Sequence, residues 1–250
     1  MVDTHAHVEL CEGTADEIVA RAAEAGVDRI LSIGLTGDSF DQTISIAEAH
    51  ESVYAAVGWH PNETTGFNDL MAAQIAETAK HPKVRAIGET GLDFYRDGAP
   101  RADQRKAFIA QIEIAADYAL PVSIHARAAE AECIDVLLEH AGQLPAVVLH
   151  CFSDPAVLDR AIEAGFYCSF AGNVTFKNAP ELREAAVRVP AELLLLETDA
   201  PFLAPQPVRG KRCEPAYVAM TAEVVAEARG VTYAELDALI TANAARVFGW

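Results

Sequence analysis

The sequence predicts an α/β protein, a single (β/α)₈ barrel of the TIM type that includes all of residues 1–250. Eight short apolar or β-branched segments alternate with Ala- and Glu-rich amphipathic segments along the chain, which is typical of a parallel sheet covered by helices. A length of 250 residues is the usual size of one such barrel. No G-x-G-x-x-G motif follows a predicted strand, which disfavours the main competitor, a doubly wound open sheet.

The alternation also gives approximate bounds for each element. The expected strands cover residues 2–7, 27–33, 53–58, 84–89, 121–125, 146–150, 166–170 and 193–197. The expected helices cover residues 15–25, 39–50, 69–79, 102–119, 128–140, 155–164, 178–188 and 215–229, and a final helical pair lies near 232–248. Residue types that cap helices support some of these bounds: Thr14, Asp38 and Asp154 as N-caps, and Gly26 and Gly165 as C-terminal glycines.

Composition limits the possible partners and compartment. The formal net charge of −18 counts against tight binding of duplex nucleic acid, which needs a basic surface, but it permits a phosphate ester whose charge bound metals could offset. The five cysteines are odd in number, widely spaced and form no C-x-x-C pair, so we expect reduced thiols and a cytoplasmic protein. We expect no signal peptide, because the first strand begins at residue 2 with no basic and apolar segment before it, and no membrane span, because apolar runs such as 193–196 are too short.

Histidines at the ends of three predicted strands carry the functional prediction. His5 and His7 stand two apart on the first strand, so their side chains point the same way. His125 and His150 end the apolar fifth and sixth strands. Each histidine alone could fill space in the core. Together, at the end of a barrel where active sites form, they indicate a metal site.

Two carboxylates complete the set of donors. Glu89 ends the fourth strand and Asp199 follows the eighth, where a carboxylate must be solvated, paired or bound to metal. Six donors are too many for one tetrahedral ion and suit two divalent ions about 3.5–4 Å apart, bridged by a carboxylate. Imidazole with carboxylate suits Zn²⁺, Mn²⁺ or Fe²⁺, and carboxylate-rich sites also take Mg²⁺. Asp3 has two interpretations: it orients a ligand histidine, or it makes a structural hydrogen bond.

Six strings of residues resemble those of the TatD family of metal-dependent hydrolases, which belongs to the amidohydrolase superfamily. They occur in order from residue 2 to about residue 220, and together they are specific. The strings are D-T-H-A-H at 3–7, G-W-H-P at 58–61, G-E-T-G-L-D at 88–93, I-H-A-R at 124–127, H-C-F-S at 150–153 and E-T-D-A-P-F at 197–202.

The resemblance implies two divalent metal ions (Mg²⁺, Mn²⁺ or Zn²⁺), one bound by His5 and His7 and the other by His125 and His150. Glu89 would bridge the two ions.

Further roles follow from the same resemblance. Asp199 would touch the first ion and accept a proton from the attacking water, so Asp199 and Glu89 are the expected catalytic residues. His60, after the third strand, would contact the substrate phosphate, although a loop hydrogen bond is its alternative role.

A basic cluster follows the eighth strand, and the resemblance implies that it grips phosphates. Three charges in four residues also occur in ordinary solvated turns, but the place of this cluster beside the expected metal site favours Arg209, Lys211 and Arg212 as substrate-binding residues. Cys213 stands where the family commonly has Asn, which puts one polar contact of the loop in doubt. Arg96 and Arg127 are further candidates for phosphate binding.

Three functions remain open at this point. The first is the one the resemblance implies: a deoxyribonuclease that trims single-stranded DNA from the 3′ end. The second is hydrolysis of another ester or amide bond, such as a lactone or an aminoacyl ester. The third is a non-catalytic barrel that serves as a scaffold. We expect a monomer, while the physiological metal, the polarity of cleavage and the choice between DNA and RNA stay open.

Overall fold

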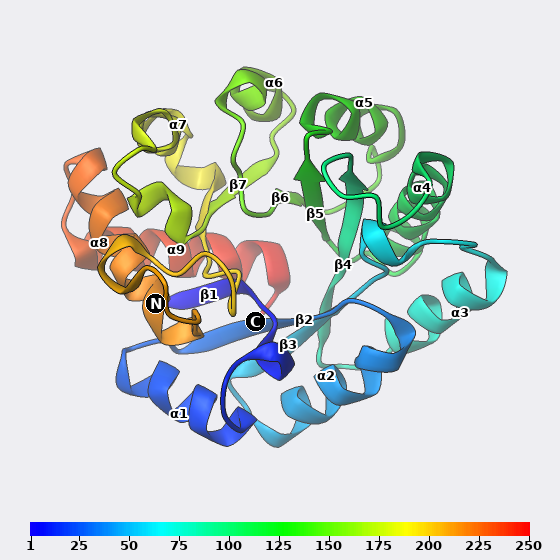
Figure 1. Cartoon of the computed structure of the whole chain (residues 1–250), viewed down its shortest axis with the longest axis horizontal. Coiled ribbons are helices and arrows are strands. Elements are labelled where there is room, and N and C mark those ends of the chain that lie inside the picture. Colours follow the sequence, from blue (N-terminus) through cyan, green and yellow to red (C-terminus); the bar gives the residue numbers. More distant parts are fainter.

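Eight parallel strands form the centre of the molecule, in sequential order from β1 to β8. The computed structural model describes residues 1–250, and Figure 1 shows the strands at the centre with the helices in a ring around them. The strands are β1 (Val2–Ala6), β2 (Arg29–Gly34), β3 (Val53–Val57), β4 (Val84–Asp93), β5 (Val122–Arg127), β6 (Val147–Leu149), β7 (Tyr167–Phe170) and β8 (Leu194–Leu196). The predicted (β/α)₈ barrel is confirmed.

Seven α-helices connect the strands and two more follow β8, and the nine together cover the outside of the barrel. They are α1 (Ala15–Glu24), α2 (Gly37–Ala49), α3 (Asp69–Thr78), α4 (Arg101–Asp117), α5 (Glu130–His140), α6 (Leu158–Glu163), α7 (Pro180–Arg188), α8 (Val218–Arg229) and α9 (Tyr233–Phe248). None of them is both long and apolar enough to cross a lipid bilayer. Their inner faces and the strands share one cluster of 67 buried hydrophobic residues.

The helix ends follow the capping chemistry in part. Thr14 caps α1 in a capping box, and the Asp154 side chain accepts a hydrogen bond from the Ala156 amide at the 3₁₀ turn before α6. The prediction of Asp38 as an N-cap was wrong, because α2 begins at Gly37, two residues earlier than expected, and Thr36 is its N-cap.

The C-terminal part of the chain differs from the expected helical pair. A single helix, α9, covers it without a break, from the Thr232 cap to the left-handed Gly249. The prediction of a pair was wrong because no glycine or proline interrupts residues 233–248.

The barrel closes between its first and last strands. A parallel bridge joins Ala6 to Ala200, and two backbone hydrogen bonds flank it, from the His7 amide to the Ala200 carbonyl (2.7 Å) and from the Asp199 amide to the His5 carbonyl (2.9 Å). The closure therefore fixes the segment after β8 beside the histidines of β1.

A glycine allows β4 and β5 to approach closely near the mouth of the barrel. Gly91 pairs with His125 in the register of these strands and has a φ of +141°, where side-chain-bearing residues are strained. A Cβ at this position would lie 2.0 Å from the carbonyl oxygen of His125. A larger residue would have to push the two strands apart.

We therefore expect Gly91→Ala to lower the free energy of unfolding by about 3–5 kcal/mol, through backbone strain and overpacking together. Gly66→Ala is the matched control, because Gly66 also has a positive φ of +70°, but a Cβ added there would meet no atom within 4 Å. Only strain acts there, so the control should lose about 1 kcal/mol. Urea unfolding measures both losses, and equal losses would contradict the close approach.

Candidate metal centre

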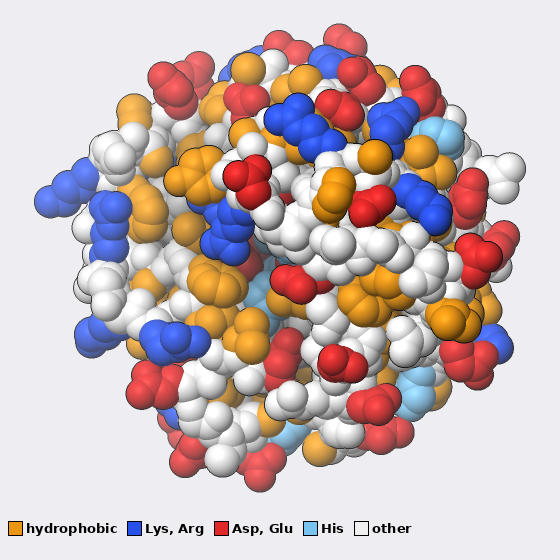
Figure 2. Space-filling view, turned by 45° about the vertical axis from the view of Figure 1, so that its right-hand side comes forward, with side chains coloured by type: hydrophobic (Ala, Val, Ile, Leu, Met, Phe, Trp, Pro, Cys, Tyr) orange, Lys and Arg blue, Asp and Glu red, His pale blue; other side chains and the backbone are white.

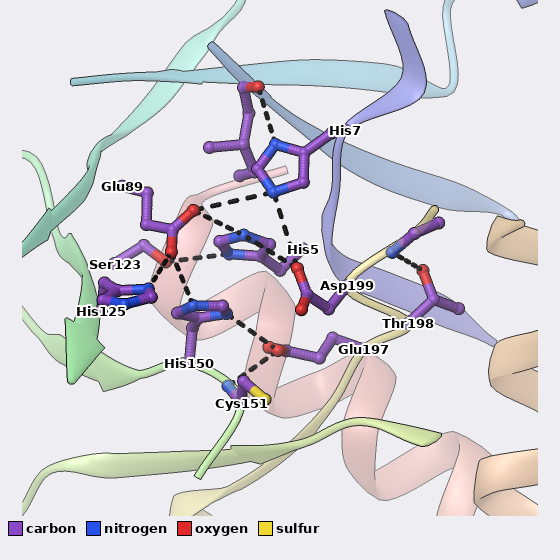
Figure 3. Close-up of polar contacts among 12 residues, drawn as sticks. His5, His7, Glu89, Ser123, His125, His150, Cys151, Glu197, Thr198 and Asp199 are labelled. Atoms are coloured by element: carbon purple, nitrogen blue, oxygen red, sulfur yellow. Dashed lines mark hydrogen bonds and ion pairs between the residues drawn. The ribbon is translucent and has the colours of Figure 1, made fainter. Parts of the chain in front are cut away.

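The six residues predicted as metal ligands lie together at the carboxyl ends of the strands (Figure 3). They come from five elements or their ends: His5 in β1, His7 just after it, Glu89 in β4, His125 in β5, His150 after β6 and Asp199 after β8. Parallel strands present their carboxyl ends at one mouth of a barrel, so residues distant in the sequence meet there.

Glu89 lies at the centre of this cluster and faces imidazoles on two sides. Its Oε2 atom is 3.4 Å from His5 Nε2 and 3.6 Å from His7 Nε2. Its Oε1 atom is 2.5 Å from His125 Nδ1 and 2.9 Å from His150 Nε2. One carboxylate thus touches both pairs of histidines, one oxygen to each pair, as a bridging ligand must.

Asp199 lies on the side of the cluster that His5 and His7 occupy. Its Oδ1 atom is 3.5 Å from His7 Nε2 and 3.9 Å from His5 Nε2. These three residues form one group whose donor atoms all lie within 4.8 Å of one another. These are the three residues predicted to contact the first ion, and their role as its ligands stays a prediction.

The second side of the cluster is arranged less simply. His125 groups with Glu89 and His60, whereas His150 groups with Glu89 and His5. His125 and His150 therefore share Glu89 but do not form one group with each other. Their joint role as ligands of a second ion stays a prediction.

The donor atoms fit a cation. His5 Nε2 is buried and has no hydrogen-bond partner, although it points at two carboxylates. The Nδ1 atoms of His5 and His7 contact the Ser123 hydroxyl and the Ile33 carbonyl, each at 3.3 Å. The carbonyl can only accept, so His7 Nδ1 is the donor, and His7 Nε2 faces the carboxylates. Without a metal ion, a proton on Nε2 lies between this nitrogen and Asp199, and a bound cation would replace that proton.

The two carboxylates are held in the charged form. Burial raises the pKa of Glu89, but the imidazoles of His150, His60 and His125 outweigh it and hold that pKa well below its usual value. Burial likewise raises the pKa of Asp199, and the hydrogen bond from His7 with the charge of His150 lowers it overall. Both groups are therefore anionic at neutral pH.

The pKa values of the histidines differ according to the charges around them. Burial lowers the pKa of His7, but Asp199 and Glu89 outweigh it and raise the pKa to about 9. The pKa of His150 lies well above its usual value, because Glu89 and Glu197 outweigh burial. His60 is the opposite case, since burial dominates and lowers its pKa to about 3. His60 is therefore neutral at pH 7.

Two supporting carboxylates were not predicted as part of the site. Glu197 Oε1 accepts hydrogen bonds from His150 Nδ1 (3.0 Å) and from the Cys151 amide (2.7 Å), which orients the imidazole toward Glu89. Asp93 Oδ2 lies 3.3 Å from His125 Nε2. Glu197 stands two residues before Asp199, and Asp93 stands four residues after Glu89. Residues at even spacing in a strand point the same way, so this spacing could have predicted that both carboxylates face the site.

Asp3 makes a structural hydrogen-bond network and does not touch a ligand imidazole. Its carboxylate accepts from the Thr198 amide (2.9 Å), the Thr198 hydroxyl (2.6 Å) and the His5 amide (3.3 Å). The second of its two interpretations is the one observed. Since Thr198 precedes Asp199, the network fixes the position of Asp199 relative to β1.

A cleft of about 500 Å³ lies over the cluster, with the six donors except His5 among its lining residues. Figure 2 shows histidine atoms at the bottom of a hollow whose edge carries basic, acidic and hydrophobic side chains. His60 lines this cleft, and so do Arg96 and Arg127. The imidazole of His60 is fixed by the Asn62 amide, which donates to its Nδ1 atom (3.1 Å).

The basic loop lies outside the cleft. Arg209 stacks its guanidinium 4.2 Å from the centroid of the Phe176 ring, Arg212 donates to the Leu10 carbonyl (2.7 Å), and Lys211 is exposed. None of the three lines the cleft. Cys213 is buried, and its amide donates to the Pro201 carbonyl (3.0 Å), so this position anchors the loop and does not face a substrate.

Fold and site together are those of a metal-dependent barrel hydrolase. The sequence profile described as "TatD related DNase" matches residues 2–249, and the chain belongs to this family. A Bacillus subtilis protein named "Uncharacterized metal-dependent hydrolase YabD" is 38% identical over 251 residues, which are 99% of this chain and 98% of that protein.

Two further relatives cover almost the whole chain. A Cronobacter sakazakii protein named "3′-5′ ssDNA/RNA exonuclease TatD" is 38% identical over 239 residues, 93% of this chain and 91% of that protein. The crystal structure of the TatD homologue YJJV from Escherichia coli is 28% identical, has a TM-score of 0.94 and covers 100% of this chain and 98% of its own. The resemblance found in the sequence is confirmed.

Metal binding should release protons. Because the pKa of His7 is about 9, this imidazole holds a proton at pH 7 that a metal ion must displace. The apparent affinity for Mn²⁺ or Zn²⁺ should therefore weaken as the pH falls, by about tenfold per pH unit for each displaced proton. Calorimetric titration at pH 7 in two buffers of different ionisation enthalpy counts the protons, and identical enthalpies in both buffers would contradict this arrangement.

Glu197→Gln tests the support of His150. The amide oxygen can still accept from His150 Nδ1 and the Cys151 amide, but the negative charge that favours a basic imidazole is lost. We expect metal affinity to fall by about 10- to 100-fold. Glu192→Gln is the matched control, because Glu192 is exposed just before β8. If the two variants bind metal equally well, Glu197 has no such role.

Proposed function

We propose that this protein is a metal-dependent exonuclease that removes nucleotides from the 3′ end of single-stranded DNA. The observation that carries the proposal is the position of Glu89 between two sets of imidazoles, beneath a cleft that also presents Arg96 and Arg127. Two-ion sites bridged by a carboxylate are suited to phosphodiester hydrolysis. The name of the Cronobacter relative supports the substrate and the polarity.

The proposed ligands are the six donors predicted from the sequence, all of which lie in one cluster. His5, His7 and Asp199 would hold one ion, His125 and His150 the other, and Glu89 both. Bound divalent ions would lower the pKa of water and polarise the phosphoryl oxygens.

Three side chains would handle the substrate and the proton. Asp199 is anionic at neutral pH and lies 3.5 Å from His7 at the cleft floor, so it can accept a proton from the attacking water. His60 is neutral, and because its Nδ1 atom accepts from the Asn62 amide, its Nε2 atom carries the hydrogen. His60 Nε2 can therefore donate to a phosphoryl oxygen. Arg127 would bind the phosphate by charge.

The basic loop is proposed to act farther along the substrate. Phe202 and Leu203 line the cleft, and the chain continues from them to Arg209, Lys211 and Arg212 outside it. These charges would contact phosphates beyond the scissile bond and not the reacting group itself. The net charge of −18 limits such contacts, which favours flexible single strands over duplexes.

The other candidate functions are not favoured. The family match and the relatives named as exonucleases support phosphodiester hydrolysis over lactone or aminoacyl-ester hydrolysis and over a scaffold. We further propose that residues 1–250 act as one domain, as a monomer, in the cytoplasm. The five unpaired cysteines support a reducing compartment, and size-exclusion chromatography with light scattering tests the monomer.

A 5′-labelled single-stranded oligonucleotide tests the activity and its direction. With Mg²⁺ or Mn²⁺ we expect a ladder of labelled products that shortens from the 3′ end, and no cleavage in excess chelator. Glu89→Ala and Asp199→Asn should each lower kcat by at least ~100-fold, because each removes a metal ligand or the proton acceptor.

The matched control is Asp135→Asn, which removes an exposed carboxylate that pairs with Arg160. It should leave the ladder unchanged. An RNA oligonucleotide of the same sequence decides between the two nucleic acids. Metal-independent cleavage, or full activity in Glu89→Ala, would reject the proposed function.

A further inference from the structure

Phe202 is a large hydrophobic side chain that is exposed in the cleft. Seven large hydrophobic side chains are exposed on the molecule, and Phe202, with 51% of its surface accessible, is the one among them that lines the cleft. Its ring lies 6.1 Å from the ring of His7, centroid to centroid, at an interplanar angle of 71°. An apolar ring thus lies at the edge of the metal centre and is accessible to a ligand in the cleft.

Hydrogen bonds fix the backbone that carries this ring. The Phe202 amide donates to the Asp199 carbonyl (2.8 Å), and the preceding Pro201 carbonyl accepts from the Cys213 amide (3.0 Å). The two preceding residues, Ala200 and Pro201, are buried. Because the segment is already ordered, a ligand that packs on the ring would lose little free energy to ordering the protein.

We propose that Phe202 is the stacking platform for the unpaired base of the nucleotide that is cleaved. The inference rests on the proposed function and adds the part of the substrate that the metal centre does not contact. Phe202 follows Asp199 by three residues in one turn, and both line the cleft, so a nucleoside whose phosphodiester lies at Asp199 can reach the ring. Every base has a flat apolar face, and stacking on an aromatic ring is tolerant of sequence.

A positively charged side chain in the same cleft supports this assignment. Arg127 lines the cleft and lies 4.1 Å from the centroid of the Tyr95 ring, which fixes its guanidinium. A single cleft therefore offers a cation for a phosphate and an apolar ring for a base. A base within a duplex is already stacked on its neighbours, so this platform selects single-stranded ends.

The test compares two single-stranded oligonucleotides that differ only in the 3′-terminal residue. One carries an ordinary nucleotide there and the other a stable abasic analogue. The wild-type protein should cleave the ordinary end with a kcat/KM on the order of 10-fold higher, the effect expected for one base stacked on an aromatic ring. Phe202→Ala should lose this preference through a higher KM, whereas Phe202→Tyr should retain it.

Leu70→Ala is the control, because Leu70 is also an exposed hydrophobic side chain but lies on α3, outside the cleft. It should keep the wild-type preference. If Phe202→Ala slows both oligonucleotides equally, or keeps the preference, the ring is not a base platform and the inference is wrong. If the wild-type protein cleaves both ends equally well, the inference alone fails. If it cleaves neither, the proposed function fails with it.

Discussion

The burial of the Glu89 carboxylate is the constraint on which the rest of the site depends. A buried anion is costly unless positive charge and hydrogen bonds surround it, and Glu89 has imidazoles from β1, β5 and the end of β6 within contact distance. These strands can deliver their side chains to one point only if the barrel is closed with the observed register. Closure of the barrel is therefore what brings the imidazoles close enough to balance the charge of Glu89.

Hydrogen bonds between β1 and the segment after β8 position the other carboxylate of the cluster, Asp199. The Asp3 carboxylate accepts hydrogen bonds from the amide and the hydroxyl of Thr198. The Asp199 amide donates to the His5 carbonyl. The proposed proton acceptor is thus fixed by the same hydrogen bonds that close the barrel. A rigid acceptor is an advantage for catalysis, since it needs no reorganisation during the reaction.

An acidic protein can bind a polyanionic substrate if positive charge is available inside the cleft. The net charge of −18 belongs to the whole molecule. The cleft itself combines two arginines and four histidines with four carboxylates, so bound divalent ions would supply much of the positive charge that a phosphate needs. Recognition would then depend on the cleft and on stacking at Phe202 more than on long-range attraction. Such an enzyme would favour flexible ends that can enter the cleft.

The sequence by itself determined the strand and helix alternation and the six donors, because their types and their places at strand ends are local properties of the chain. Tertiary structure decided what depends on distance. It showed that Glu197 and Asp93 support the histidines, that Glu89 faces two pairs at once, and that the basic loop lies outside the cleft. A motif specifies which groups occur, but only the closure and register of the barrel specify which atoms face each other.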